Sequence, residues 1–167
     1  KDHVVFSYLH LAASKSLTEA LLSSQCVAIA YETTEDMKGQ FPLLRPMSEI
    51  AGRMSVQIGA HFLEKLHGGS GVLLSGVPGV PPAEVVILGS GVVGASAARI
   101  AVGMGARVTV LSLDLWQLRM LDDLYHGRLV TVASSQAMIH RLLRSADLVI
   151  GAAYLPAART PRVITRA

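Results

Sequence analysis

The chain has 167 residues, of which 51% are hydrophobic and 16% are charged, with a net charge of +3 and a mean hydropathy of +0.45. This composition excludes an extended disordered chain, and glycine and proline interrupt the longest uncharged windows, so no membrane span is expected. The arginines form no basic run and aromatic residues are few, which disfavours nucleic-acid binding. We expect strands buried on both faces, and further apolar surface that meets another subunit or another part of the same protein.

The first 45 residues are predicted to form a strand, a helix and a second strand. Val4–Leu9 is an apolar run typical of a strand. Ser16 and Glu19 then have capping-box spacing at the start of a short apolar helix. Cys26–Tyr31 is predicted to be a second, buried strand.

A long helix is predicted to begin at Ser48, which is a good N-cap residue. Apolar side chains four residues apart share one face of this helix: Ile50, Met54, Ile58 and Phe62. The helix should stop at the glycine-rich residues 67–71, and an apolar, turn-rich connection should follow.

After Pro82, short apolar runs alternate with helical ones. Strands are expected at residues 85–88, 108–111, 129–132 and 148–150, and helices from about 92, from about 115 and over 136–144. This alternation predicts an α/β fold, a Rossmann-type doubly wound parallel sheet. Two full mononucleotide-binding halves would supply six strands, so the predicted sheet of about four is incomplete at its C-terminal side.

Three glycines in this region have the spacing of a dinucleotide-binding turn. Gly89, Gly91 and Gly94 form G-x-G-x-x-G between a predicted strand and a predicted helix. The first glycine allows the tight turn, the second lets the backbone approach a pyrophosphate, and the third lets the helix pack against the strand. The free N–H groups of the first helical turn then face the phosphates.

The position that normally binds the ribose carries a serine. An acidic residue is expected about twenty residues after the turn, and the chain has Ser112 there. A serine lacks the two anionic oxygens that bind the diol and repel a 2′-phosphate, so affinity for NAD should weaken and discrimination against NADP should weaken more. Asp114 either reaches back to the ribose or caps the helix from Leu115, and the pattern favours the cap.

Several motifs together resemble the bacterial alanine dehydrogenases along nearly the whole chain. The segments that carry the resemblance are "SYLHLAA", "AIAYET", "PLLRPMSEIAGRMSVQIGAHFLEK", "GVPGVPPAEVVILGSGVVG", "LRMLDDL" and "ADLVIGAAYLP". The related proton-translocating transhydrogenases share the architecture but differ before the connecting helix, and they rank second.

The resemblance implies a substrate domain and an NAD domain joined by long helices. Residues 1–45 would be the end of the N-terminal substrate-domain section, 46–66 a connecting helix, and 67–167 an NAD-binding domain that is incomplete at its C-terminus. It also implies a homo-oligomer, often a hexamer, and the reversible NAD-dependent oxidative deamination of L-alanine to pyruvate and ammonium. A single cysteine, Cys26, makes a cytoplasmic location the expectation.

His10 in "SYLHLAA" corresponds by resemblance to the family's catalytic histidine. An imidazole can accept the proton from the water that attacks the imine and return it in the reverse reaction. Without the family, a histidine after an apolar strand is more often structural. That interpretation is kept for His3, His61, His67, His126 and His140, none of which has a partner at metal-ligand spacing, so no metal is expected.

The resemblance further places one residue near the substrate and a set of residues on the cofactor. Met47 would face the active site, and Ser48 would touch the cofactor as well as cap its helix. The other cofactor-binding positions would be Gly89, Gly91, Val92, Val93, Gly94, Ser112, Gln117, Ser134, Ala153 and Tyr154.

Three of these residues depart from the family pattern. Ser112 replaces the ribose-binding aspartate, Gln117 replaces a lysine or arginine at the adenosine end, and Tyr154 replaces a smaller aliphatic residue. The family's substrate-binding arginine and lysine and its catalytic aspartate lie outside this sequence, so the piece alone should not oxidise alanine. The alternatives are a binding module for NAD(H) or NADP(H), a non-catalytic relative and a transhydrogenase-like subunit.

Overall fold

The computed structural model describes residues 2–153 and 162–164. The described residues divide into two compact units, residues 2–47 and residues 48–153 with 162–164. Helix α2, Arg45–Leu63, begins in the first unit and continues in the second. None of the helices in the described part of the chain is long and apolar enough to cross a bilayer.

The first unit has the predicted order of strand, helix and strand. Strand β1 (Val4–Ser7) pairs in parallel with β2 (Val27–Ala30), and helix α1 (Lys15–Ser24) connects them. Two short 3-10 turns, η1 (Leu11–Ala13) and η2 (Tyr31–Thr33), follow the carboxyl ends of the two strands. The parallel pairing follows from the helical crossover, which brings the second strand back in the same direction.

Two expectations for this unit were wrong. The cap of α1 is Ser14, whose Oγ accepts the N–H of Leu17 at 3.3 Å, because the helix begins before Ser16. Strand β2 is exposed rather than buried: Val27 keeps 58% of its surface. Two strands are all that this sheet has among the described residues, so its apolar side chains lack a second covering layer.

Helix α2 begins at Arg45, three residues before the predicted cap. The carbonyl of Phe41 accepts the N–H groups of Leu44 and Arg45 at 3.2 and 3.0 Å, which starts the helical turn early. Pro46 is accommodated because the first turn of a helix leaves its N–H groups without intrahelical partners. Ser48 therefore lies inside the helix, and its prediction as N-cap was wrong.

The face of α2 that packs inward is built from small and medium residues. Its buried positions are Gly52, Val56, Gly59 and Leu63. The four predicted apolar residues do share a face, but that face is exposed, with Phe62 at 61%. Glycine lets the backbone approach its neighbours: a Cβ on Gly52 would overlap the Val93 carbonyl oxygen, and one on Gly59 would lie 2.6 Å from Leu148.

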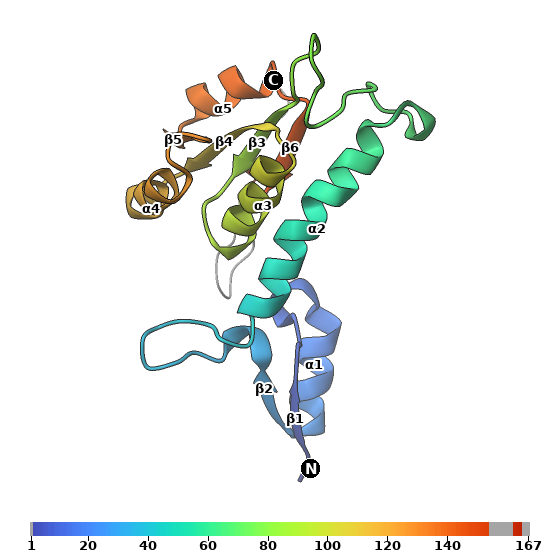
Figure 1. Cartoon of the computed structure of the whole chain (residues 1–167). Helices are drawn as coiled ribbons and strands as arrows, with labels where there is room; N and C mark the ends of the chain where they lie inside the picture. The colour runs from blue at the N-terminus through green and yellow to red at the C-terminus, as the bar shows by residue number, and fades with distance from the viewer. Residues whose placement is uncertain (1, 154–161, 165–167) are drawn as a thin grey trace. The chain divides into compact units, whose positions relative to one another are not determined.

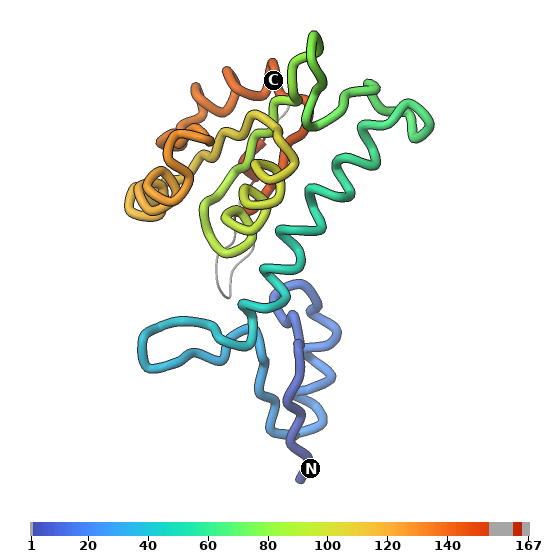
Figure 2. Tube along the Cα trace, viewed as in Figure 1, coloured from blue at the N-terminus to red at the C-terminus, as the bar shows by residue number. Residues whose placement is uncertain are grey.

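The second unit contains a parallel four-stranded sheet among its described residues, in the order β5-β4-β3-β6. Its elements are β3 (Glu84–Leu88), α3 (Val92–Gly103), β4 (Arg107–Ser112), α4 (Leu115–Tyr125), β5 (Val130–Ala133), α5 (Gln136–Leu143) and β6 (Leu148–Gly151). Figure 1 shows β3 at the centre with β4 and β6 on either side. Figure 2 follows the chain from the end of α2, through the 3-10 turn η3 (Lys65–His67) and an extended connection, into β3.

The two faces of this sheet are covered by different helices. Val85, Ile87, Val108 and Val110 join one buried cluster with residues of α2, α3 and α4. Val86, Leu88 and Leu111 join a second cluster with Ile139 of α5. This alternation along β3 and β4 confirms the predicted doubly wound α/β fold, because neighbouring residues of a strand point to opposite faces.

Candidate functional site

The predicted cofactor residues of the second unit gather at the carboxyl edge of the sheet. The Gly89 N–H donates to the Leu111 carbonyl at 2.7 Å, and the Ala152 N–H donates to the Leu88 carbonyl at 2.8 Å. Strand order reverses at β3, since β4 lies on one side and the later β6 on the other. Ligands of open α/β sheets bind at such a switch point, beyond the carboxyl ends of the strands.

Two of the three glycines are required by packing. Gly89 has φ +116°, and a Cβ there would lie 2.5 Å from the Ala152 carbonyl oxygen at the end of β6. A Cβ on Gly94 would overlap the Gly89 carbonyl oxygen and lie 3.4 Å from the Ala152 side chain. These contacts hold the start of α3 tightly against the turn and the neighbouring strand.

Gly91 has a different environment. It precedes α3 with φ −63°, which any residue adopts, and its Cβ position has no neighbouring atom within 4 Å. The absent side chain therefore leaves open space at the first turn of α3, where the N–H groups of Val92 and Val93 lie outside the intrahelical hydrogen-bond ladder. An open cradle of backbone donors fits the pyrophosphate of a dinucleotide.

Ser112 takes part in a hydrogen-bonded cluster with the glycine turn. Its Oγ lies 2.7 Å from the Oγ of Ser90, and the Ser90 hydroxyl also lies 3.1 Å from Oε1 of Gln117. The Asp114 N–H donates to Ser112 Oγ at 3.1 Å. The end of β4, the turn after β3 and the first turn of α4 are thus joined by uncharged side chains.

Asp114 acts as the cap of α4. Its Oδ1 accepts the N–H groups of Trp116 and Gln117, each at 3.0 Å, which is the favoured arrangement for an N-cap aspartate. This contact supports the interpretation of Asp114 as the cap of α4.

The remaining cofactor positions have different outcomes. Ser134 follows β5, and its N–H donates to the Ser112 carbonyl at 2.9 Å, which places it beside the Ser112 backbone. Ala153 follows β6 and is half-buried. Tyr154 lies outside the described residues. Ser48 and Met47 are half-buried in the first turns of α2, and their roles stay predictions.

His10 has an unusual backbone that a buried carboxylate holds. Its φ and ψ are 48° and 41°, the left-handed region that few non-glycine residues adopt. Glu32 is 8% exposed, and its carboxylate accepts the N–H groups of His10 and of Leu9, the latter at 3.2 Å. Since β1 and β2 are parallel neighbours, Glu32 follows β2 just where His10 follows β1.

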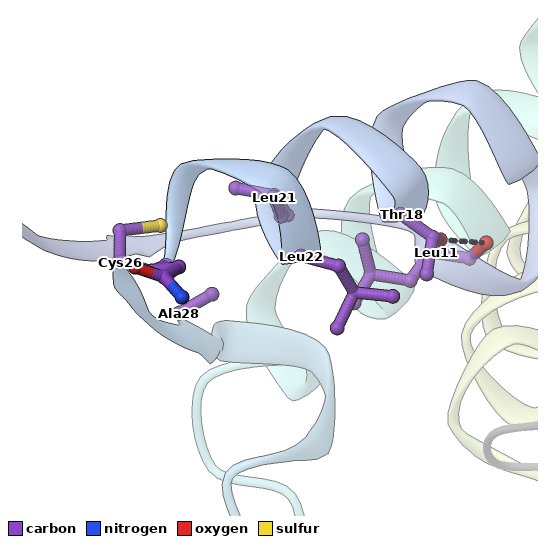
Figure 3. A pocket seen from close by; sticks show the side chains of 7 residues that line it. Leu11, Thr18, Leu21, Leu22, Cys26 and Ala28 are labelled. Carbon is purple, nitrogen blue, oxygen red and sulfur yellow. Dashed lines mark hydrogen bonds between the residues drawn. The ribbon is translucent and has the colours of Figure 1, made fainter. Parts of the chain in front are cut away.

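A separate hollow lies on the first unit. Seven residues line it: Leu11, Thr18, Leu21, Leu22, Gln25, Cys26 and Ala28. Figure 3 shows Thr18 on α1 donating to the Leu11 carbonyl at 3.4 Å, with Cys26 at the far end. No predicted site residue lines this hollow, so we do not assign the cofactor or the substrate to it.

Three residues at and just after the end of α2 lie closer to one another than their spacing in the sequence indicated. Ligand atoms of His61, Glu64 and His67 lie within 4.8 Å of one another. The argument from spacing against metal ligands therefore fails for these two histidines. All three side chains are exposed, and His67 already forms an ion pair with Glu64 at 3.4 Å when protonated.

Family models match the chain in two parts. The N-terminal domain of alanine dehydrogenase/PNT matches residues 1–51, and the C-terminal domain matches residues 55–167, more than half of the chain. The chain belongs to the alanine dehydrogenase/PNT family. This finding confirms the resemblance drawn from the sequence.

Over the aligned residues, the alanine dehydrogenases are about half identical to the chain. The alanine dehydrogenase of Halomonas elongata is 54% identical over 97% of this chain and 44% of its own length. A solved L-alanine dehydrogenase superimposes with a TM-score of 0.89 at 50% identity, over 99% of this chain and 46% of that one. A transhydrogenase from Sinorhizobium meliloti has a TM-score of 0.76 at 20% identity, over 98% of this chain and 48% of that one, a likeness of fold alone. The chain thus spans less than half the length of each of these three proteins.

Two residues of this alanine dehydrogenase/PNT chain escaped the sequence analysis. Ser90 stands between two fingerprint glycines, and its position in the turn was a signal that could have identified it. Glu32 gave no local signal, because its contacts with Leu9 and His10 span 23 and 22 residues.

The pKa of Glu32 reflects its contacts. Burial by itself raises this pKa, but hydrogen bonds from the N–H groups of Glu32 itself, His10 and Leu9, with the nearby His10 imidazole, outweigh burial and lower the pKa below its ordinary value. A group whose pKa is lower in the folded protein stabilises the fold above its unfolded pKa of about 4.3. That contribution is lost as the pH falls through the folded pKa.

Replacing Glu32 with glutamine should destabilise the first unit in a pH-dependent way. At pH 7 the loss should be about 2 kcal/mol, because the amide accepts the N–H groups less strongly than the carboxylate and its own NH₂ faces donors. The difference from wild type should shrink as the pH falls through the acid range. Urea unfolding at pH 7 and at pH 3 tests this, with the exposed Glu35→Gln as control. A loss that is equal at both pH values would contradict the role of the Glu32 charge.

Proposed function

We propose that the chain works as part of an alanine dehydrogenase, which catalyses the reversible oxidative deamination of L-alanine to pyruvate and ammonium. The observation that carries this proposal is the 50% identity and TM-score of 0.89 to an L-alanine dehydrogenase over 99% of the chain. The glycine turn supports it, because the open Cβ position of Gly91 leaves a cradle for a dinucleotide pyrophosphate.

The cofactor of this proposal is a nicotinamide dinucleotide, and NAD is typical of the named relatives. When bound, the nicotinamide supplies the hydride acceptor. Residues of this chain would hold its other parts: the first turn of α3 would bind the pyrophosphate, and the strand ends that carry Ser112 and Ser134 would lie along the adenosine half.

His10 is the proposed proton-transfer residue. Its imidazole would take the proton from the water that attacks the imine carbon and, in the reverse direction, return it to the carbinolamine hydroxyl as water leaves. The Glu32 carboxylate accepts hydrogen bonds from the backbone N–H groups of Leu9 and His10. It would therefore fix the backbone position from which the His10 side chain extends. Glu32 is thus a positioning residue in this proposal.

We also propose that the protein is a cytoplasmic homo-oligomer. The exposed apolar face of α2, formed by Ile50, Met54, Ile58 and Phe62, is surface of the kind that subunits bury. The one cysteine of the chain, Cys26, fits the reducing cytoplasm.

Replacing His10 with asparagine in the protein expressed from its full reading frame should lower kcat for alanine oxidation by about 100-fold or more. Affinity for NADH should stay unchanged, because the cofactor contacts come from other residues. Steady-state kinetics and NADH fluorescence titration measure the two effects. Exposed His126→Asn is the matched control: it also replaces a left-handed, non-glycine residue. If the wild type binds NADH but does not oxidise alanine, the binding-module alternative replaces this proposal.

A further inference from the structure

The hydroxyl of Ser112 is already engaged within the protein. Ser112 is 9% exposed and Ser90 is 5% exposed, and their Oγ atoms lie 2.7 Å apart. Ser112 Oγ also accepts the Asp114 N–H at 3.1 Å. A hydroxyl has one hydrogen and two lone pairs. Gln117 Oε1 can only accept, so when Ser90 donates to it, Ser112 donates to Ser90. Ser112 then keeps one lone pair for a ribose hydroxyl and no hydrogen for a phosphate oxygen.

Gln117 has the free polar group of this cluster. Its Oε1 faces the Ser90 hydroxyl at 3.1 Å, so the opposite side of the carboxamide, Nε2, points away from Ser90. The residue lies in the first turn of α4 and is exposed. An exposed amide nitrogen donates hydrogen bonds and accepts none, and it therefore suits either a ribose oxygen or a phosphate oxygen.

The end of β4 lacks the acidic side chain that a site selective for NAD normally has there. The nearest acid in sequence, Asp114, is committed to capping α4 through its Oδ1. Arg107 begins β4 at the opposite end of the strand, where it pairs with Glu84 at 3.2 Å. The Ser90–Ser112–Gln117 cluster itself is neutral. None of its three side chains has a carboxylate to hold the diol or repel a 2′-phosphate. The carboxylate beside the cluster, Asp114, binds the N–H groups at the start of α4, where the helix dipole offsets part of its charge.

We propose that the Ser90–Ser112–Gln117 cluster sets nucleotide specificity and admits the 2′-phosphate, so that the protein binds NADH and NADPH with affinities within about ten-fold of each other. This inference rests on the proposed dinucleotide site. In it, Nε2 of Gln117 donates to the 2′-phosphate, and Ser90 holds the Gln117 carboxamide in place.

The test compares the two reduced nucleotides by isothermal titration calorimetry on the protein from its full reading frame. Ser112→Asp should strengthen NADH binding and weaken NADPH binding, changing their ratio by at least about ten-fold, since a charged hydrogen bond contributes about that factor. Ser70→Asp adds the same charge at an exposed position outside the cluster and should leave the ratio unchanged.

A second variant tests the proposal even if Ser112→Asp, which changes a buried residue, prevents folding. Gln117→Glu places a carboxylate on the exposed member of the cluster, and it should weaken NADPH more than NADH by about ten-fold. Wild-type affinities for NADH and NADPH that differ by clearly more than about ten-fold would overturn the inference alone, as would unchanged ratios in both variants. Failure of the wild type to bind either nucleotide would overturn the dinucleotide site itself.

Discussion

Gly91→Ala is expected to leave the fold intact and to weaken NADH binding by about ten-fold or more. The backbone of Gly91 has an ordinary φ of −63°, and a methyl group there meets no atom within 4 Å, so the protein has no reason to lose stability. The same methyl group would occupy the space through which the pyrophosphate approaches the first turn of α3. Thermal melting and calorimetric titration with NADH measure the two effects separately.

Gly94→Ala provides the opposite case in the same turn. Its methyl group would overlap the Gly89 carbonyl oxygen, so either the turn or α3 has to move, at a cost of about 3 kcal/mol. Gly103→Ala, in open space at the end of α3, is the matched control and should be neutral or slightly stabilising. Wild-type NADH affinity in Gly91→Ala would refute the pyrophosphate assignment, whereas a normal melting temperature in Gly94→Ala would refute the packing.

Gly52→Ala should be among the most destabilising single changes to α2. Within an exposed helix this substitution normally stabilises by up to about 1 kcal/mol, and here the sign reverses. The added Cβ would overlap the Val93 carbonyl oxygen and lie 2.8 Å from Cβ of Ser96, which forces α2 away from α3. We expect a loss of about 3 kcal/mol or more, measured by urea unfolding.

The same variant has a functional readout, because Val93 belongs to the first turn of α3. Any shift of that turn should weaken NADH binding together with stability. Gln57→Ala, on an exposed position of the same helix, should change neither quantity appreciably. A stable Gly52→Ala protein with normal NADH affinity would show that α2 does not pack on α3 through this glycine.

Local patterns carried most of the fold prediction for the second unit. The predicted strand at 85–88 is β3, Glu84–Leu88, and the helix predicted from about 115 is α4, which begins at Leu115. Such segments are predictable because apolar strands, glycine turns and Asp114 as cap act within a few residues. The glycine fingerprint likewise located the open position at Gly91.

The sequence did not predict features that depend on distant parts of the chain. The apolar periodicity of α2 identified its exposed face, because the face that packs inward uses Gly52 and Gly59 for close approach rather than large side chains. The sequence also contained no sign that Ser90, 22 residues away, lies within hydrogen-bond distance of Ser112. No rule that reads neighbouring residues finds such contacts.

Hydrogen bonds extend the sheet beyond its strand ends, and this affects the free energy of ligand binding at that edge. Gly89, Ser134 and Ala152 each follow a strand, yet their N–H groups donate to carbonyls of the neighbouring strands at 2.7 to 2.9 Å. Their amide protons should therefore exchange with solvent only when the sheet opens. A ligand that binds along this edge would order little of the chain, and most of its contact energy would appear as affinity.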